Sequence, residues 1–148
     1  MDNWERNLVA SLDDVAEILE TSKRVAVLGI KTEAQRGQPA FEVPRYMLEA
    51  GYDVVPVPVY YPEVTRILGR PVYRSVADVP PPVDIVNVFR RPNDVPAHVD
   101  DILAARPRVV WMQSGIANAA AAEAFARAGI RVVQNRCIMV DHARFARR

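Results

Sequence analysis

The chain is poor in the residues that build disulfide frameworks and metal centres. It has one cysteine, Cys137, and two histidines among 148 residues. A single cysteine cannot form an internal disulfide, so the sequence predicts a protein of a reducing compartment, and we expect the cytoplasm. His98 and His142 lie far apart in the sequence. We expect both on solvated helix faces, with no metal site and no catalytic set.

Strong net charge and long apolar runs are also missing. The formal net charge is +1, which gives no argument for a nucleic-acid or membrane partner. No apolar run approaches the roughly 18 residues of a membrane-spanning helix. We therefore expect no nucleic acid and no membrane, and a single domain over residues 1–148 that is a monomer or a weak homodimer. A protein partner is left open.

The chain does contain a regular alternation of β-branched runs and helical patterns. Ser11 and Asp14 have the spacing of a capping box and predict a helix over about residues 11–21. A second helix is predicted to start near Val43, because Pro44 is tolerated in a first turn. Further helices are predicted at 92–105, 118–128 and from about 138. Strands are predicted at 24–29, 53–57, around 72–73, 83–88, 108–112 and 131–133.

This alternation predicts the fold class. It is an α/β, three-layer, doubly wound Rossmann-like fold with a mostly parallel sheet of about five to six strands. Ligands of such sheets bind beyond the carboxyl ends of the strands. Two predicted strands end in polar residues there, one in Arg90 and Arg91 and the next in Gln113 and Ser114. Adjacent side chains point in different directions, so we expect at most one of the two arginines to face a ligand, the other being exposed or paired with Asp94.

Two common nucleotide fingerprints are absent. A dinucleotide site needs closely spaced glycines after the first strand and an acidic residue after the second. Here Gly29 is followed by no further glycine until Gly37, and the second strand runs into Pro56-Val57-Pro58. No glycine-rich run ends in Gly-Lys-Ser or Gly-Lys-Thr, so a triphosphate loop is also absent.

Several short segments occur in a fixed order along this chain. They are Ala26-Val27-Leu28-Gly29, Pro44-Arg45-Tyr46-Met47-Leu48, Gly51-Tyr52, Val88-Phe89-Arg90-Arg91, Trp111-Met112-Gln113-Ser114-Gly115-Ile116 and Arg136-Cys137-Ile138. With these segments the chain closely resembles the small stand-alone CoA-binding proteins and, through them, the amino-terminal CoA-binding domain of the succinyl-CoA synthetase α subunit. The resemblance covers about residues 23–145 and implies CoA or an acyl-CoA as ligand.

The residues after the first strand suit the phosphates of CoA. Gly29 permits close backbone approach, the loop over residues 30–37 supplies amides, and Lys31, Arg36 and Arg45 supply positive charge. We therefore expect the diphosphate to bind backbone nitrogens just past this strand. Singly, each cation could equally be a solvated surface residue.

The resemblance implies positions for the rest of the ligand. It places Gly29 to Thr32 at the phosphates, Val57, Pro58 and Tyr60 or Tyr61 beside the nucleotide, and Gln113 to Gly115 at the pantetheine arm. Tyr73 either faces the adenine or packs in the core. The predicted site comprises Gly29, Ile30, Lys31, Thr32, Arg36, Arg45, Val57, Pro58, Tyr60, Tyr73, Phe89, Arg90, Arg91, Gln113, Ser114 and Gly115.

Two classes of function stay open. The first is non-catalytic binding of CoA or an acyl-CoA, as a carrier, sensor or regulatory module. The alternative is a small nicotinamide-dependent oxidoreductase or an acyl-CoA-handling enzyme subunit. The synthetase's phosphorylated histidine belongs to a second domain without counterpart in these residues, so ligase activity is not expected. Cys137 could form a mixed disulfide with the CoA thiol, although lone cysteines are more often buried fillers.

Overall fold

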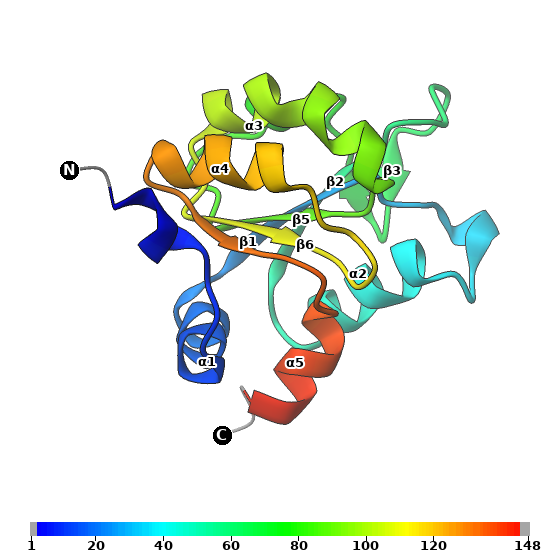
Figure 1. The fold of residues 1–148 in the computed structure, drawn as a ribbon. Helices are drawn as coiled ribbons and strands as arrows, with labels where there is room; N and C mark the ends of the chain where they lie inside the picture. The colour runs from blue at the N-terminus through cyan, green and yellow to red at the C-terminus, as the bar shows by residue number, and fades with distance from the viewer. Residues whose placement is uncertain (1–2, 146–148) are drawn as a thin grey trace.

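The computed structural model describes residues 3–145 and has a five-stranded parallel sheet at its centre (Figure 1). The strands are β1 (Arg24–Leu28), β2 (Asp53–Val57), β5 (Ile85–Val88), β6 (Val109–Met112) and β7 (Arg131–Val133), in the order β2-β1-β5-β6-β7. Every neighbouring pair in this sheet is parallel. The strands are buried on both faces, which explains their continuous β-branched runs. The domain predicted over 1–148 includes residues 1–2 and 146–148, which lie outside the described part.

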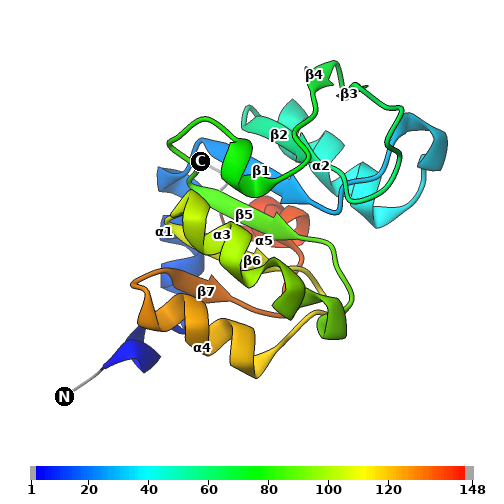
Figure 2. The ribbon, with the colours of Figure 1, turned by 90° about the horizontal axis from the view of Figure 1, so that it is seen from above.

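Helices cover both faces of the sheet (Figures 1 and 2). One face carries α1 (Leu12–Thr21), α2 (Pro39–Glu49) and α5 (Ile138–Phe145), and the other carries α3 (Val99–Ala105) and α4 (Ala119–Arg127). Each face has its own hydrophobic cluster, the first around Phe41 and Trp111 and the second around Ile102 and Phe125. The predicted three-layer, doubly wound α/β fold is confirmed.

Two helix starts follow directly from capping residues. The Ser11 hydroxyl accepts a hydrogen bond from the Asp14 amide at 3.1 Å, and the Asn118 side chain accepts one from the Ala121 amide at 2.9 Å. These bonds satisfy amides that have no partner within the helix. The predicted beginnings of α1 and α4 are therefore correct.

The predicted third parallel strand around Val72 and Tyr73 is wrong. A short antiparallel hairpin forms just before it, from β3 (Arg66–Ile67) and β4 (Arg70–Pro71). Its two-residue turn, Leu68-Gly69, has positive φ at both positions, as hairpin turns that match the twist of their strands require. The main sheet consequently has five strands, with β2 at an edge. An edge position accommodates Pro56, which has no N–H to donate to a neighbouring strand.

The predicted start of α2 near Val43 is also wrong. The helix begins at Pro39, where the absent amide costs nothing, and Pro44 lies inside it. Because Pro44 has no N–H, the Ala40 carbonyl loses its usual helical partner. That carbonyl instead accepts a hydrogen bond from the Lys31 amide at 3.0 Å. The internal proline thus ties the loop after β1 to the first turn of α2.

Shorter 3-10 helices complete the chain. They are η1 (Trp4–Asn7), η2 (Glu33–Gln35), η3 (Val76–Asp78) and η4 (Pro92–His98). The helix predicted over 92–105 is therefore split into η4 and α3, with Pro96 inside the irregular half. Within residues 3–145, no helix has the length and hydropathy needed to cross a membrane. The same residues contain no cluster of three metal-ligating side chains.

Candidate functional site

The site lies at the switch point of the sheet, where β1 and β5 are neighbours and the chain connections diverge to either side. Gly29 follows β1 and Phe89 follows β5. Gly29 has φ +88°, and a Cβ there would lie 2.3 Å from the Phe89 carbonyl oxygen. The glycine is thus required by the approach of two backbone segments. From the sequence alone, this glycine is interpreted as permitting the approach of a phosphate.

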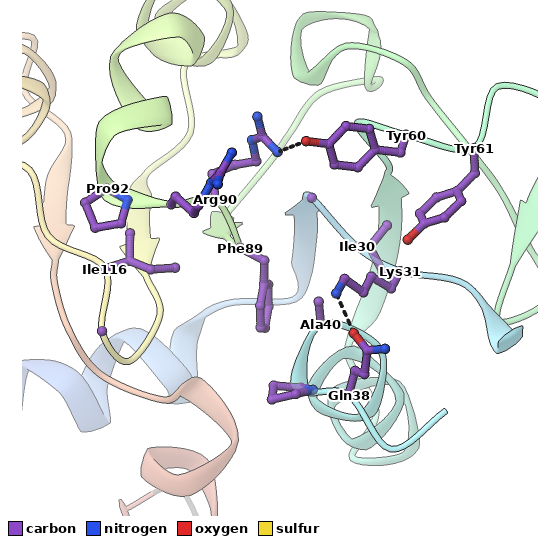
Figure 3. Close-up of a pocket in the computed structure, with 14 residues that line it drawn as sticks. Ile30, Lys31, Gln38, Ala40, Tyr60, Tyr61, Phe89, Arg90, Pro92 and Ile116 are labelled. Atoms are coloured by element: carbon purple, nitrogen blue, oxygen red, sulfur yellow. Dashed lines mark hydrogen bonds between the residues drawn. The ribbon is translucent and has the colours of Figure 1, made fainter. Parts of the chain in front are cut away.

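A groove of about 480 Å³ opens at this switch point, and we call it the groove (Figure 3). One wall comes from the start of α2 and the loop after β1, and the other from the residues after β5. Tyrosines of the loop after β2 lie at one end. It is lined by Gly29, Ile30, Lys31, Gln38, Pro39, Ala40, Tyr60, Tyr61, Phe89, Arg90, Arg91, Pro92, Gly115 and Ile116.

Only some of the amides near the groove remain free to bind a ligand. The amides of Gly29, Lys31 and Thr32 donate to the Val57 carbonyl, the Ala40 carbonyl and the Gln35 side chain, respectively. In contrast, the amides of Ile30 and Ala40 have no hydrogen-bond partner among residues 3–145. Both residues line the groove, and Ala40 belongs to the first turn of α2. Fewer backbone donors are therefore available than the sequence predicts. One of them, the Ala40 amide, belongs to the start of α2.

Two cations with different surroundings face the groove (Figure 3). The Lys31 ammonium donates to the Gln38 side chain across the loop. The Arg90 side chain is largely buried, and its guanidinium donates to His98 Nε2 at 3.2 Å and to the Tyr60 hydroxyl at 3.4 Å. The hydrogen bond from Arg90 to the Tyr60 hydroxyl, together with the positive charge of Arg90, lowers the pKa of Tyr60. Arg90 is thus held in place before any ligand binds.

Arg91 differs from Arg90 in exposure. Its side chain is 84% exposed and donates to Asp94 at 3.1 Å, whereas the Arg90 side chain is 16% exposed. Arg90 also lies within 3.7 Å of Asp94. Arg91 is therefore exposed and paired with Asp94, as expected for one of the two arginines. Both arginines line the groove, so the expectation that at most one faces a ligand stays a prediction.

A second hollow, which we call the slot, continues from the groove. Its volume is about 370 Å³, and it shares Pro39, Phe89 and Ile116 with the groove. Its remaining lining residues are Gly37, Glu42, Val43, Gln113, Ser114, Cys137 and Met139. The half-buried Cys137 lies at the entry to α5 and faces this slot.

One polar residue beside the predicted Gln113 was not predicted from the sequence. Asn87, 1% exposed, lies in the middle of β5 and donates to the Trp111 carbonyl and to Gln113 Oε1, at 3.3 and 3.1 Å. Its own Oδ1 is buried and has no hydrogen-bond partner in the described part of the chain. An asparagine inside an otherwise apolar strand was the available signal, because buried polar groups require partners.

Six predicted site residues line neither hollow. Thr32 caps η2, Val57 and Pro58 are buried behind Gly29, and Tyr73 packs against the core at the outer edge of β2. Arg36 is exposed, and Arg45 forms an ion pair with Glu42 at 2.5 Å. For Tyr73 the surroundings match the core-packing interpretation. The structure brings together the other ten, which are Gly29, Ile30, Lys31, Tyr60, Phe89, Arg90, Arg91, Gln113, Ser114 and Gly115.

The expectation that both histidines are simply solvated is wrong. His98 is half-buried and accepts from Arg90, and His142 is half-buried and bonds to the Tyr46 hydroxyl at 3.0 Å. Burial lowers the pKa of both histidines, and the charge of Arg90 further lowers that of His98. A neutral His98 with its proton on Nδ1 can accept the Arg90 N–H.

Several known proteins are similar to this chain in sequence, and two with solved structures share its fold. An uncharacterised Bacillus subtilis protein, YneT, is 35% identical over 130 residues, which cover 88% of this chain and 93% of that protein. A solved Thermus thermophilus structure is 38% identical with a TM-score of 0.83, covering 92% of this chain and 99% of that one. A hypothetical protein from Pyrococcus horikoshii is 34% identical with a TM-score of 0.82, covering 92% of each chain.

More distant structures share the fold alone. A dinucleotide-forming acetyl-coenzyme A synthetase from Ca. Korarchaeum cryptofilum is 19% identical with a TM-score of 0.63, and the match covers 89% of this chain and 27% of that chain. The family model described as CoA binding domain matches residues 23–143, which include every lining residue of the groove and the slot. The chain belongs to this CoA-binding domain family.

Proposed function

We propose that this protein binds CoA or an acyl-CoA non-catalytically in the groove and the slot. The observation that carries the proposal is the pair of unpartnered amides, Ile30 and Ala40, beside two cations at the switch point. A nucleotide diphosphate needs this combination of backbone donors and positive charge. The family membership supports CoA as the nucleotide.

The diphosphate binds at the start of α2. The Ala40 amide and the positive end of the α2 dipole face the groove, and Ile30 contributes its amide from the loop after β1. Lys31 leaves Gln38 to bind a phosphate oxygen, and Arg90 binds from the opposite wall. The exposed Arg91 and Arg36 add long-range attraction.

The two ends of the ligand bind in chemically different surroundings. Tyr60, 58% exposed at the groove edge, offers a ring face on which the adenine stacks. The pantetheine arm extends over Phe89 and Ile116, the residues that join the groove to the slot. The residues that face the ligand are mainly hydrogen-bond donors, cations and apolar groups. Such residues suit holding and releasing a ligand, as a carrier, sensor or regulatory module would.

Isothermal titration calorimetry of ligand-stripped protein with CoA, NAD and ATP tests this proposal. We expect heat with CoA and a weaker response to NAD and ATP. Lys31→Ala should weaken CoA binding by about 10- to 100-fold, which corresponds to one charge-assisted hydrogen bond of roughly 1–3 kcal/mol. Arg45→Ala is the matched control, because Arg45 is a nearby cation that lines neither hollow.

Three results would contradict the proposal. Absence of heat with CoA at millimolar concentration would remove CoA as the ligand. Preferential binding of NAD would instead favour the oxidoreductase alternative. Equal losses in Lys31→Ala and Arg45→Ala would show that the phosphates bind elsewhere or respond only to overall charge.

A further inference from the structure

The slot contains a polar group that has no hydrogen-bond partner among residues 3–145. Gln113 is 4% exposed, and its Oε1 accepts hydrogen bonds from the Ile138 amide at 2.9 Å and from Asn87 Nδ2 at 3.1 Å. A backbone amide can only donate, so the carboxamide atom that faces Ile138 must be the oxygen. The orientation of the Gln113 side chain is therefore fixed by chemistry.

The nitrogen of the same carboxamide faces the slot. Oε1 occupies the inner branch, toward Asn87 and Ile138, and Gln113 lines the slot, so Nε2 lies on the slot side. Nε2 has no hydrogen-bond partner among residues 3–145. A donor that is almost buried and unpaired costs free energy unless a ligand or water accepts from it.

The surroundings hold Gln113 and its neighbours firmly. Trp111 Nε1 donates to the Arg136 carbonyl at 2.8 Å, and the Arg136 guanidinium forms hydrogen bonds of 2.6 and 2.9 Å with the buried Asp141 carboxylate. The Asn135 side chain accepts from the Gly115 amide at 2.7 Å. These bonds fix the segment that leads into α5. That segment carries Cys137 and ends at the Ile138 amide. The slot is consequently preorganised around the Gln113 amide.

The other side chains of the slot are mostly apolar. Pro39, Val43, Phe89, Ile116 and Met139 line it together with Gln113, and the polar side chains of Glu42 and Ser114 also belong to the lining. A ligand group that suits this slot has one hydrogen-bond acceptor next to a short apolar chain. A thioester has this chemistry, since its carbonyl oxygen accepts and its acyl chain is apolar, whereas a free thiol is a weak acceptor.

We propose that the slot recognises the acyl-thioester end of an acyl-CoA. Gln113 Nε2 donates to the thioester carbonyl oxygen, and the apolar side chains enclose a short acyl chain of about the size of butyryl. This inference rests on the proposed function, because the groove must hold the nucleotide for the thioester to reach the slot. It adds that the acylated form is the preferred ligand.

Three ligands separate the contributions to binding. CoA has no acyl chain, butyryl-CoA has the chain and the carbonyl, and S-butyl-CoA has a chain of the same length with a methylene in place of the carbonyl. We expect butyryl-CoA to bind about tenfold more tightly than CoA, and about 3- to 10-fold more tightly than S-butyl-CoA. Calorimetry on the wild-type protein measures all three affinities.

The variant Gln113→Glu removes the donor but keeps an oxygen for the Ile138 amide. We expect it to lose the preference for butyryl-CoA over S-butyl-CoA, whatever the change in its affinity for CoA itself. Gln134→Glu is the matched control, because Gln134 also accepts a backbone N–H, from Asn118 at 2.9 Å, but lies outside both hollows. That control should keep the preference.

A second measurement needs no substitution. Cys137 is the sole cysteine of the chain, so alkylation by iodoacetamide, followed by intact mass, reports on the slot alone. Butyryl-CoA and S-butyl-CoA should both slow the alkylation. Adenosine 3′,5′-bisphosphate, which lacks the arm, should not slow it.

The outcomes distinguish failure of this inference from failure of the proposed function. Equal affinity for the three ligands, or equal loss of all three in Gln113→Glu, would overturn the inference while CoA binding stands. The second of these results would mean that Gln113 binds the pantetheine arm. Unchanged Cys137 alkylation with saturating butyryl-CoA would also overturn it. Binding of none of the ligands would overturn the proposed function itself.

Discussion

The two ends of the parallel strands differ in how their polar groups are satisfied. We call the side of the sheet where the strands begin the amino edge, and the side where they end the carboxyl edge. At the amino edge, the Asp84 carboxylate accepts from the Lys23 and Arg24 amides at 2.8 and 2.9 Å, and Asp53 pairs with Arg24 and Arg70. At the carboxyl edge, the Ile30 and Ala40 amides and Gln113 Nε2 have no partner among the described residues.

This difference separates structural polar groups from those available to a ligand. A parallel sheet leaves backbone donors and acceptors at both edges, and buried ones must be satisfied in some way. Side chains of the protein do so at the amino edge, where the charges stabilise the fold. The donors left at the carboxyl edge mark the place where an external acceptor completes the network.

The largest expected effect tests the contact that holds the switch point together. Gly29→Ala places a Cβ 2.3 Å from the Phe89 carbonyl oxygen and strains a residue at φ +88°. We expect a loss of roughly 2–6 kcal/mol in the free energy of unfolding, measured by urea denaturation. Gly37→Ala is the matched control, because Gly37 also has positive φ, +92°, but open space around it. A similar loss in both variants would show that the close backbone approach is not what requires Gly29.

A smaller loss is expected at the amino edge. Asp84→Ala removes the acceptor for two backbone amides and should lower the free energy of unfolding by about 2–3 kcal/mol. Affinity for CoA should not change, whereas Lys31→Ala should show the reverse pattern. A weakened CoA affinity in folded Asp84→Ala protein would remove the proposed distinction between the two edges.

The smallest effect concerns pH. Burial lowers the pKa of His98 and His142 below 6.5, so between 6.5 and the lowered value the unfolded chain binds more protons than the folded chain. Stability is then present above pH 6.5 and is lost as the pH falls, by at most about 1.4 kcal/mol per pH unit for each histidine. Urea midpoints measured from pH 7.5 to 5.5 should decrease.

The variant His98→Gln removes the contribution of His98 to the pH dependence of stability and keeps an acceptor for Arg90. Its stability should depend less steeply on pH than that of the wild type over the same range. An unchanged slope would mean that His98 titrates normally in the folded protein.

Local signals predicted most of the secondary structure. The β-branched runs located all five strands of the sheet, and Ser11 and Asn118 located two helix starts. The errors occurred where local rules compete. Pro44 looked like a first-turn residue, but the freed Ala40 carbonyl found a partner outside the helix. The strand predicted around Val72 was displaced by a hairpin whose turn, Leu68-Gly69, received no weight in the sequence analysis.

The candidate site was predicted less completely than the fold. Residues directly after β1, β5 and β6 line the two hollows, as the strand-end rule implies. Ala40 and Asn87 were missed, because the first lies at a misplaced helix start and the second inside a strand. Arg36 and Arg45 were grouped with Lys31 by sequence distance, although only Lys31 lines the groove.

The sequence by itself determined the order of strands and helices and the edge of the sheet that carries the ligand-facing residues. These properties depend on side-chain size, branching and capping over short stretches of chain. Only the tertiary structure decided which donors remain unpaired at that edge. The partners of the Lys31 amide and the Gln113 carboxamide, Ala40 and Ile138, are brought to them by packing rather than by chain proximity.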